Sequence, residues 1–281
     1  MSHGRHSKLL CGQGAVTFRR AGTGKDARSP RRAYRSSAAS NRCNLPEIRK
    51  MSETTYRDVE QYYNNEYYAD LENGRPNWHF SAYLNILQIR RSDIGKAIAD
   101  IGCGTCHLLS HANKRGLKCS GIDISEKAIV HAKRRFPFFD LHVGKAEVLP
   151  WEDEQFDFVT CLGALEHFLD QHRALGEMRR VSKRDGTFLI MVPNSEFPDW
   201  RGTDQQQIKE TLMSLGEWQS FFEKSGFRVM KVLPDRWPVR WIPLRKRNPI
   251  RLLRGLIERY RIWSLPLDKS YQFIFVMKRI R

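Results

Sequence analysis

Short apolar runs alternate with amphipathic stretches from residue 96 almost to the end of the chain. Apolar runs of roughly four to eight residues are typical of strands, and apolar residues spaced three or four apart are typical of helices. The pattern predicts strands at 96–101, 117–124, 139–143, 156–162, 187–192, 227–233 and 271–278. Strands that alternate with helices form βαβ units, so we expect an α/β fold with a doubly wound, seven-stranded, mostly parallel sheet.

Helices are predicted in the intervals between strands, at 105–115, 126–135, 167–182 and 215–225. Ser125 is suited to cap the second of these helices, and Gly226 is suited to end the fourth. Asp185 and Gly186 predict a loop before the fifth strand. The last two strands have no clean helix between them. We therefore expect the last strand to pair antiparallel, with residues 235–269 as an insertion.

The segment 51–95, ahead of the first strand, is rich in aromatic residues. Its pattern predicts one or two helices. Their aromatic side chains either form a packing face or close over a substrate pocket. We expect an N-terminal helical lid at 51–95, followed by the main domain at 96–281.

The net charge of +17 is concentrated at the two ends of the chain. Residues 1–50 contain 12 Lys and Arg against 2 Asp and Glu, and residues 236–281 contain 13 against 2, whereas residues 51–235 contain 23 against 27. Residues 1–50 have no hydrophobic period, which predicts a disordered basic extension. We expect this extension to be either a targeting segment or an untranslated stretch ahead of a start at Met51.

The basic insertion contains a predicted amphipathic helix at 249–264. Its apolar residues fall on one helical face, at Leu253, Leu256, Ile257, Tyr260 and Trp263. Such a helix can form a lid over the domain, lie on an anionic membrane surface through residues 245–264, or hold the phosphates of a nucleic acid. We expect a lid first, membrane contact second and nucleic acid third.

Cysteines and apolar runs give no sign of secretion or of a membrane span. The six cysteines lack the framework spacing of disulfide-stapled secreted domains. No apolar run approaches the ~18 residues of a membrane span. We therefore predict a cytoplasmic protein, peripheral to a membrane where the basic helix binds one. The sequence leaves the oligomeric state open.

The segment Asp100-Ile101-Gly102-Cys103-Gly104-Thr105 ends the first predicted strand and opens the next helix. Glycines in such a turn let the backbone approach a ligand closely. An NAD fingerprint needs a third glycine three residues after Gly104, where this chain has His107, so a pyrophosphate is disfavoured. Asp123 ends the second strand and is suited to accept hydrogen bonds from both hydroxyls of a ribose. These features predict an adenosine ligand. The alternative interpretation is that Asp123 only caps the following helix.

Five motifs in order resemble the methyltransferase type 11 group of the class I S-adenosylmethionine (SAM)-dependent methyltransferases. They are Asp-Ile-Gly-Cys-Gly-Thr at 100–105, Gly-Ile-Asp-Ile-Ser at 121–125, Gly-Lys-Ala-Glu-Val-Leu-Pro at 144–150, Phe-Asp-Phe-Val at 156–159 and Leu-Glu-His-Phe at 165–168. The resemblance covers about residues 96–234. It implies a Rossmann-like methyltransferase fold, SAM as the cofactor and methyl transfer to an O, N or C nucleophile.

The resemblance also implies roles for individual residues. The methionine half of SAM would lie against Asp100, Gly102 and Gly104, and its ribose would bind Asp123. The rest of the SAM pocket would be formed by Ile124, Ala146, Glu147, Cys161 and Leu162. Lys145 departs from the family pattern, since many relatives carry there an Asp that binds the adenine amino group.

The Glu166-His167 pair is similar to part of the ubiquinone-type O-methyltransferase motif. That family implies a metal held by this pair and one further Glu, at a position where this chain has Gly163. The two ligands that remain, Glu166 and His167, make a poor metal site, so we predict that the protein requires no metal. We expect Glu166 and His167 to face the substrate, with His167 either a general base or a structural histidine. Cys103 and Cys106 have thioredoxin-like spacing, but the SAM loop explains them better.

The sequence therefore predicts a SAM-dependent methyltransferase that acts on a small-molecule, lipid-linked or glycan acceptor. The basic ends keep an RNA (tRNA) methyltransferase open as an alternative. Gly163 and Lys145 keep open a SAM-binding regulatory protein that has no catalytic activity.

Overall fold

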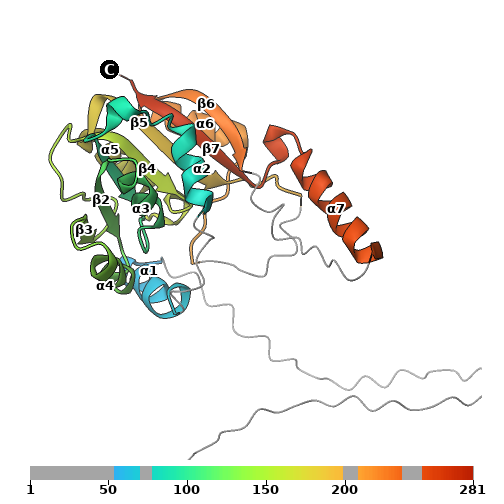
Figure 1. The fold of residues 1–281 in the computed structure, drawn as a ribbon, viewed down its shortest axis with the longest axis horizontal. Helices are drawn as coiled ribbons and strands as arrows, with labels where there is room; N and C mark the ends of the chain where they lie inside the picture. Colours follow the sequence, from blue (N-terminus) through green and yellow to red (C-terminus); the bar gives the residue numbers. More distant parts are fainter. Residues whose placement is uncertain (1–53, 70–77, 199–207, 236–248, 281) are drawn as a thin grey trace, which may run out of the picture. The chain divides into compact units, whose positions relative to one another are not determined.

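The structure, a computed structural model, describes residues 54–69, 78–198, 208–235 and 249–280 (Figure 1). All of the described elements belong to one compact unit within residues 50–281. The predicted basic extension at 1–50 lies outside the described residues, as does the first part of the basic insertion, 236–248.

Within the described residues, seven strands form one sheet in the order β3-β2-β1-β4-β5-β7-β6 (Figure 1). The strands are Ala97–Ile101 (β1), Lys118–Asp123 (β2), Asp140–Val143 (β3), Phe156–Leu162 (β4), Ser182–Pro193 (β5), Phe227–Asp235 (β6) and Gln272–Arg279 (β7). Strands β1 to β5 pair parallel, and β7 pairs antiparallel with β5 and with β6. The predicted mostly parallel sheet with an antiparallel last strand is confirmed.

The strand order reverses at β1. The chain moves outward from β1 through β2 to β3, and then crosses back to β4 on the other side of β1. In open α/β sheets, ligands bind at such a reversal, in the crevice outside the carboxyl ends of the strands. The strands β1, β2 and β4 end at Ile101, Asp123 and Leu162, so the segments that follow these residues meet where we expect binding.

The core has two layers, one on each face of the sheet. The described helices are α1 (Tyr56–Tyr62), η1 (Tyr63–Tyr67), α2 (Trp78–Ile86), η2 (Arg91–Asp93), α3 (His107–Asn113), α4 (Glu126–Arg135), η3 (Leu165–His167), α5 (Gln171–Val181), α6 (Leu215–Lys224), α7 (Pro249–Trp263) and η6 (Leu267–Lys269). Buried residues of α5 and α6 belong to one layer, and those of α2, α3 and α4 to the other. Successive residues of β7 divide between the layers, with Phe273 and Phe275 in the first and Ile274 in the second.

Two predicted helix ends are confirmed by their caps. The Oγ of Ser125 accepts a hydrogen bond from the N–H of Ala128 at 3.2 Å, which caps α4 at its predicted start. Helix α6 ends at Lys224, and Gly226 follows with a φ of +83°. That left-handed conformation is the one in which glycine commonly ends a helix.

The prediction of a single helix at 167–182 is wrong, because the structure divides this segment into the end of one short helix and a second, separate helix. The short helix η3 ends at His167, and α5 begins only at Gln171. The side chain of Asp170 accepts a hydrogen bond from the N–H of Arg173 at 2.9 Å. Asp170 thus caps a new helix, and the residues between η3 and α5 are free to reach the pocket described below.

The loop predicted at Asp185-Gly186 lies inside β5. Pairing between β4 and β5 jumps from Phe156 opposite Ser182 to Phe158 opposite Thr187. Several residues of β5 are therefore left out of the regular ladder, as in a β-bulge. This irregularity accommodates the loop-forming Asp-Gly pair within the strand.

The predicted amphipathic helix of the insertion is α7. A lid packed on the domain would bury its apolar residues. Instead, Leu253, Ile257 and Tyr260 have 60, 56 and 68% of their surface exposed. The helix is where the sequence predicted it, but the apolar face that a lid would bury is open to solvent.

Candidate functional site

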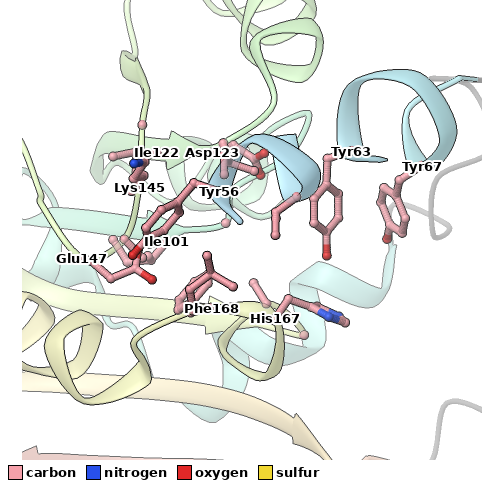
Figure 2. A pocket seen from close by; sticks show the side chains of 18 of the residues that line it. Tyr56, Tyr63, Tyr67, Ile101, Ile122, Asp123, Lys145, Glu147, His167 and Phe168 are labelled. Carbon is pink, nitrogen blue, oxygen red and sulfur yellow. The ribbon is translucent and has the colours of Figure 1, made fainter. Parts of the chain in front are cut away.

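A pocket opens where the segments after β1, β2 and β4 meet the N-terminal helices (Figure 2). Its cavity volume is about 110 Å³. Its lining comprises Tyr56, Val59, Tyr63, Tyr67, Tyr68, Ile101, Gly102, Ile122, Asp123, Ile124, Gly144, Lys145, Ala146, Glu147, Leu162, Gly163, Ala164, His167, Phe168 and Leu169. The pocket therefore lies at the sheet edge that the strand order indicates.

The loop after β1 requires glycine at two positions. Gly102 has a φ of +76°, and a Cβ atom built on it would lie 2.5 Å from the Cβ of Ala164. Gly104 has a φ of +50°, and a Cβ there would lie 2.6 Å from the hydroxyl of Tyr68. Side chains are excluded at both positions, so the bare backbone of this loop forms a cradle. Gly102 lines the pocket, whereas Gly104 is set back from the lining.

Asp100 supports this loop from behind the pocket wall. It is 5% exposed and is not a lining residue. Its Oδ1 accepts a hydrogen bond from the hydroxyl of Thr160 in β4 at 2.6 Å. Burial raises the pKa of Asp100 to about 7, and the hydrogen bond from Thr160 opposes that shift. The carboxyl therefore ties the end of β1 to β4.

Asp123 lines the pocket from the end of β2. Its Oδ2 accepts a hydrogen bond from the N–H of Gly104 at 2.8 Å, and its Oδ1 accepts one from the N–H of Ser125 at 2.9 Å. Burial raises the pKa of Asp123 to about 6, and both hydrogen bonds oppose the shift. A carboxylate has about four acceptor positions, so Asp123 retains capacity for a ligand. The bond to Gly104 also fixes the glycine loop against β2.

The segment after β3 forms the next part of the wall. Ala146 and Glu147 line the pocket, together with Ile124. The ammonium group of Lys145 lies 3.7 Å from the ring centroid of Tyr56, which is a cation–π contact. Lys145 is thus held against α1.

Cys161, predicted to close the SAM pocket, lies in the hydrophobic core and not in the lining. Its side chain is fully buried, while the next residue, Leu162, lines the pocket. Adjacent residues in a strand point to opposite faces, so only one of this pair can face a given side. Cys161 therefore lies behind the pocket wall, and Leu162 faces the pocket.

The N-terminal helices contribute four tyrosines to the lining, Tyr56, Tyr63, Tyr67 and Tyr68. The rings of Tyr63 and Tyr67 meet edge to face with centroids 5.2 Å apart, and those of Tyr67 and Tyr68 are 4.9 Å apart. Figure 2 shows Tyr63 and Tyr67 projecting from η1 toward the side of the pocket where His167 lies. The sequence predicted an aromatic lid here, but its spacing did not show which rings reach the pocket.

The segment η1 is a π-helix, a geometry that is rare and frequently found at functional sites. It is anchored beside Asp123. The Oδ1 of Asn64 accepts hydrogen bonds from the hydroxyl of Ser125 at 2.8 Å and from the N–H of Lys127 at 3.2 Å. Asn64 therefore joins η1 to the N-terminus of α4 and positions the tyrosines.

Three potential ligand side chains gather at the other end of the pocket. His167 lines it, and Glu166 lies beside it, 2% exposed. The carboxylate of Glu210 approaches both, so that one ligand atom of each residue lies within 4.8 Å of the others. Our prediction of no required metal assumed two ligands, and the structure supplies a third. No local motif marks Glu210, which lies far along the chain from the Glu-His pair.

The hydrogen bonds of His167 define its orientation. Its Nδ1 lies 2.9 Å from the carbonyl oxygen of Lys209, which can only accept, so Nδ1 carries the proton. Burial lowers the pKa of His167. The imidazole is therefore neutral at pH 7, and Nε2 keeps a lone pair. The ring of Tyr63 lies 6.1 Å from that of His167, centroid to centroid.

Cys103 and Cys106 do not have the character of a redox pair. Their sulfur atoms are 3.8 Å apart, and both side chains are buried. Burial raises the pKa of the Cys103 thiol well above its usual range. Thiol–disulfide chemistry needs an accessible thiolate, so this loop favours ligand binding over redox chemistry.

Residues 99–190 match the protein family described as "Methyltransferase domain". The uncharacterized methyltransferase YcgJ of Bacillus subtilis is 28% identical over 158 residues, which cover 51% of this chain and 62% of that protein. The ubiquinone biosynthesis O-methyltransferase of Coxiella burnetii is 30% identical over 107 residues, which cover 37% of this chain and 46% of that protein. The chain thus spans about half the length of these curated relatives.

A solved structure shares the fold. It is the geranyl diphosphate C-methyltransferase of Streptomyces coelicolor in complex with Mg²⁺, geranyl diphosphate and S-adenosyl-L-homocysteine. The alignment has a TM-score of 0.58 and 16% identity, and it covers 81% of this chain and 99% of that one. This likeness shows the fold alone, whereas the five motifs and the match at 99–190 identify a methyltransferase domain of the type 11 group within this chain.

Proposed function

We propose that this chain transfers a methyl group from SAM to an oxygen, nitrogen or carbon atom of a small-molecule, lipid-linked or glycan acceptor. The observation that carries the proposal is that one pocket is lined by two chemically different walls. The glycine loop and Asp123 form the first wall, and the tyrosines of η1 and His167 form the second. The first suits a nucleoside with an amino-acid tail, and the second suits an acceptor beside it.

Two observations support the fit of the first wall to SAM. Gly102 presents its backbone to the pocket at a position where a side chain would clash with Ala164, and a side chain at Gly104 would clash with Tyr68. Asp123 faces the pocket with acceptor capacity that its two N–H partners do not use. We therefore assign the methionine half to the glycine loop, with Asp100 in support, and the ribose to Asp123. The residues assigned to the adenine and to the remaining SAM surface are Ile124, Ala146, Glu147 and Leu162.

When bound, SAM supplies a methyl group activated by a positively charged sulfonium. The contribution of the chain is then to position the acceptor and to exclude water. Tyr63, Tyr67 and Tyr68 would do both, because their rings pack on one another along the pocket. Burial raises the pKa of Tyr63 and of Tyr68, so their hydroxyls remain protonated donors.

We assign Glu166 and His167 to the acceptor side as the catalytic pair. The neutral His167 can accept a hydrogen bond or a proton at Nε2 from an acceptor group. Glu210 joins this pair in the structure, so we include it among the residues that contact the acceptor. Sulfonium is a reactive methyl donor, so positioning contributes more than a dedicated base.

Calorimetry with SAM and with NAD tests the cofactor site. We expect wild type to bind SAM but not NAD, and Asp123→Ala to bind SAM about tenfold or more weakly, since hydrogen bonds to a charged group contribute ~1.5–3 kcal/mol each. Asp185→Ala is the control, because Asp185 is exposed and outside the pocket. Thermal unfolding shows whether each variant is folded. Equal SAM affinity in Asp123→Ala and wild type would show that Asp123 does not contribute to SAM binding.

Tritium-labelled SAM tests the acceptor class. The full chain is incubated separately with a total lipid extract, with polar small molecules and with tRNA. We expect label in the lipid or small-molecule fraction. Label in tRNA alone would contradict the proposed acceptor class, and SAM binding without transfer to any fraction would favour the regulatory alternative. The cytoplasmic location stays a prediction.

A further inference from the structure

Helix α7 has a covered side and an exposed apolar side. Leu252, Gly255 and Ile262 recur along one side and are buried or half-buried. A second set of large apolar side chains is between 47 and 68% exposed: Leu253, Leu256, Ile257, Tyr260 and Trp263. One side of the helix is therefore less exposed than the other, which carries a separate apolar stripe open to solvent.

The exposed stripe is continuous. Its residues follow the spacing i, i+3, i+4, i+7 and i+10, which places them along one helical face. The rings of Tyr260 and Trp263 lie 6.4 Å apart at its C-terminal end. Contiguous apolar patches of this kind are uncommon on monomeric proteins and mark interaction sites.

The charge of the segment limits the kind of partner. Residues 236–281 contain 13 Lys and Arg against 2 Asp and Glu. A nucleic acid would use the basic residues but leave the leucine and isoleucine side chains in water. An anionic lipid surface uses both, because its phosphates attract Arg and Lys while its acyl region accepts apolar and aromatic side chains.

We propose that α7 docks the chain on an anionic lipid surface, lying in the plane of the interface with its exposed stripe toward the acyl chains. At ~1.5 Å per residue, a 15-residue helix is shorter than the ~30 Å hydrocarbon core of a bilayer. Among the described residues, no helix has both the length and the apolar character that a bilayer crossing needs. The contact is therefore peripheral. This proposed contact does not depend on methyl transfer, and it would locate the chain at a lipid surface.

Sedimentation of the full chain with vesicles tests this contact. One set of vesicles is pure phosphatidylcholine, and the other also contains phosphatidylglycerol. We expect binding to the anionic vesicles that weakens as NaCl is raised, because salt screens the basic residues. The double variant Leu256→Gln/Ile257→Gln should bind about tenfold or more weakly, since it removes apolar surface that lipid would bury.

The matched control is Phe138→Gln/Met230→Gln. It also replaces two large side chains that are exposed, 68 and 57%, but they lie on the domain and not on α7. We expect this control to bind vesicles like wild type, and both double variants to bind SAM like wild type.

Three results would overturn the proposal. The first is no binding to anionic vesicles at low salt. The second is equal binding by Leu256→Gln/Ile257→Gln and wild type. The third is self-association in analytical ultracentrifugation that depends on the exposed stripe and occurs without vesicle binding.

Discussion

Asp123 is the residue through which the glycine loop, the start of α4 and the pocket are connected. Its two oxygens accept hydrogen bonds from Gly104 and Ser125, and its side chain also lines the pocket. Asp123 is not itself the cap of α4, because Ser125 occupies that position, but it binds the N–H of this cap while it faces the pocket. One carboxylate has enough acceptor positions to hold the loop and to bind a ligand.

The protonation of Asp123 makes SAM affinity depend on pH. Burial raises its pKa to about 6, and a protonated carboxyl is a poorer acceptor for ribose hydroxyls. We expect SAM affinity, measured by calorimetry, to fall as pH is lowered through about 6. Asp123→Asn should bind more weakly at pH 8 and change little with pH. A wild-type affinity that stays constant between pH 5 and pH 8 would contradict this prediction.

Gly102→Ala should destabilise the fold by about 1–3 kcal/mol, because it puts a side chain in a left-handed conformation and against Ala164. Gly176→Ala in α5 is the control. Nothing lies within 4 Å of a Cβ at Gly176, and alanine is favoured over glycine inside a helix by about 0.5–1 kcal/mol. Chemical denaturation should therefore show opposite changes in the free energy of unfolding. A Gly102→Ala variant as stable as wild type would show that the loop tolerates a side chain.

Among the elements, η1 contributes pocket residues that the periodicity of the sequence did not identify. Its tyrosines form part of the wall, and Asn64 fastens it to the first turn of α4. The acceptor side thus depends on a short π-helix held by a few hydrogen bonds. Such an element can open locally without unfolding the sheet.

Asn64→Ala should loosen this element. It removes two hydrogen bonds, each worth about 0.5–1.5 kcal/mol. We expect faster amide hydrogen exchange in residues 54–69, with little change in the melting temperature of the whole chain. Asn65→Ala is the control, because the neighbouring Asn65 is exposed. Unchanged exchange in Asn64→Ala would show that η1 is held mainly by its ring contacts.

For the whole molecule, the buried carboxyl groups of Asp100 and Asp123 shape the dependence of stability on pH. Folding raises their pKa values from 3.8 to about 7 and about 6. The folded chain therefore binds more protons than the unfolded chain between these values. Their contribution to stability is fully present below pH 3.8 and is lost as pH rises through about 6 and 7.

The ligand-free chain should consequently lose stability from these two groups between pH 5 and pH 8. Asp100→Asn should reduce this loss, because a neutral amide has no charge to bury, while the exposed Asp185→Asn should leave it as in wild type. Thermal unfolding at a series of pH values measures the effect. If the melting temperature of Asp100→Asn fell with pH as steeply as that of wild type, this prediction would be contradicted.

The sequence by itself determined the strand pattern, the mostly parallel sheet, the glycine loop and the acid at the end of β2. These features follow from periodicity and from the backbone demands of consecutive residues. Only the tertiary structure decided that Glu210 joins Glu166 and His167, that Cys161 lies in the core, and which face of α7 is exposed. Those outcomes depend on how residues distant in the chain approach one another, and on which side of each strand or helix meets its neighbour.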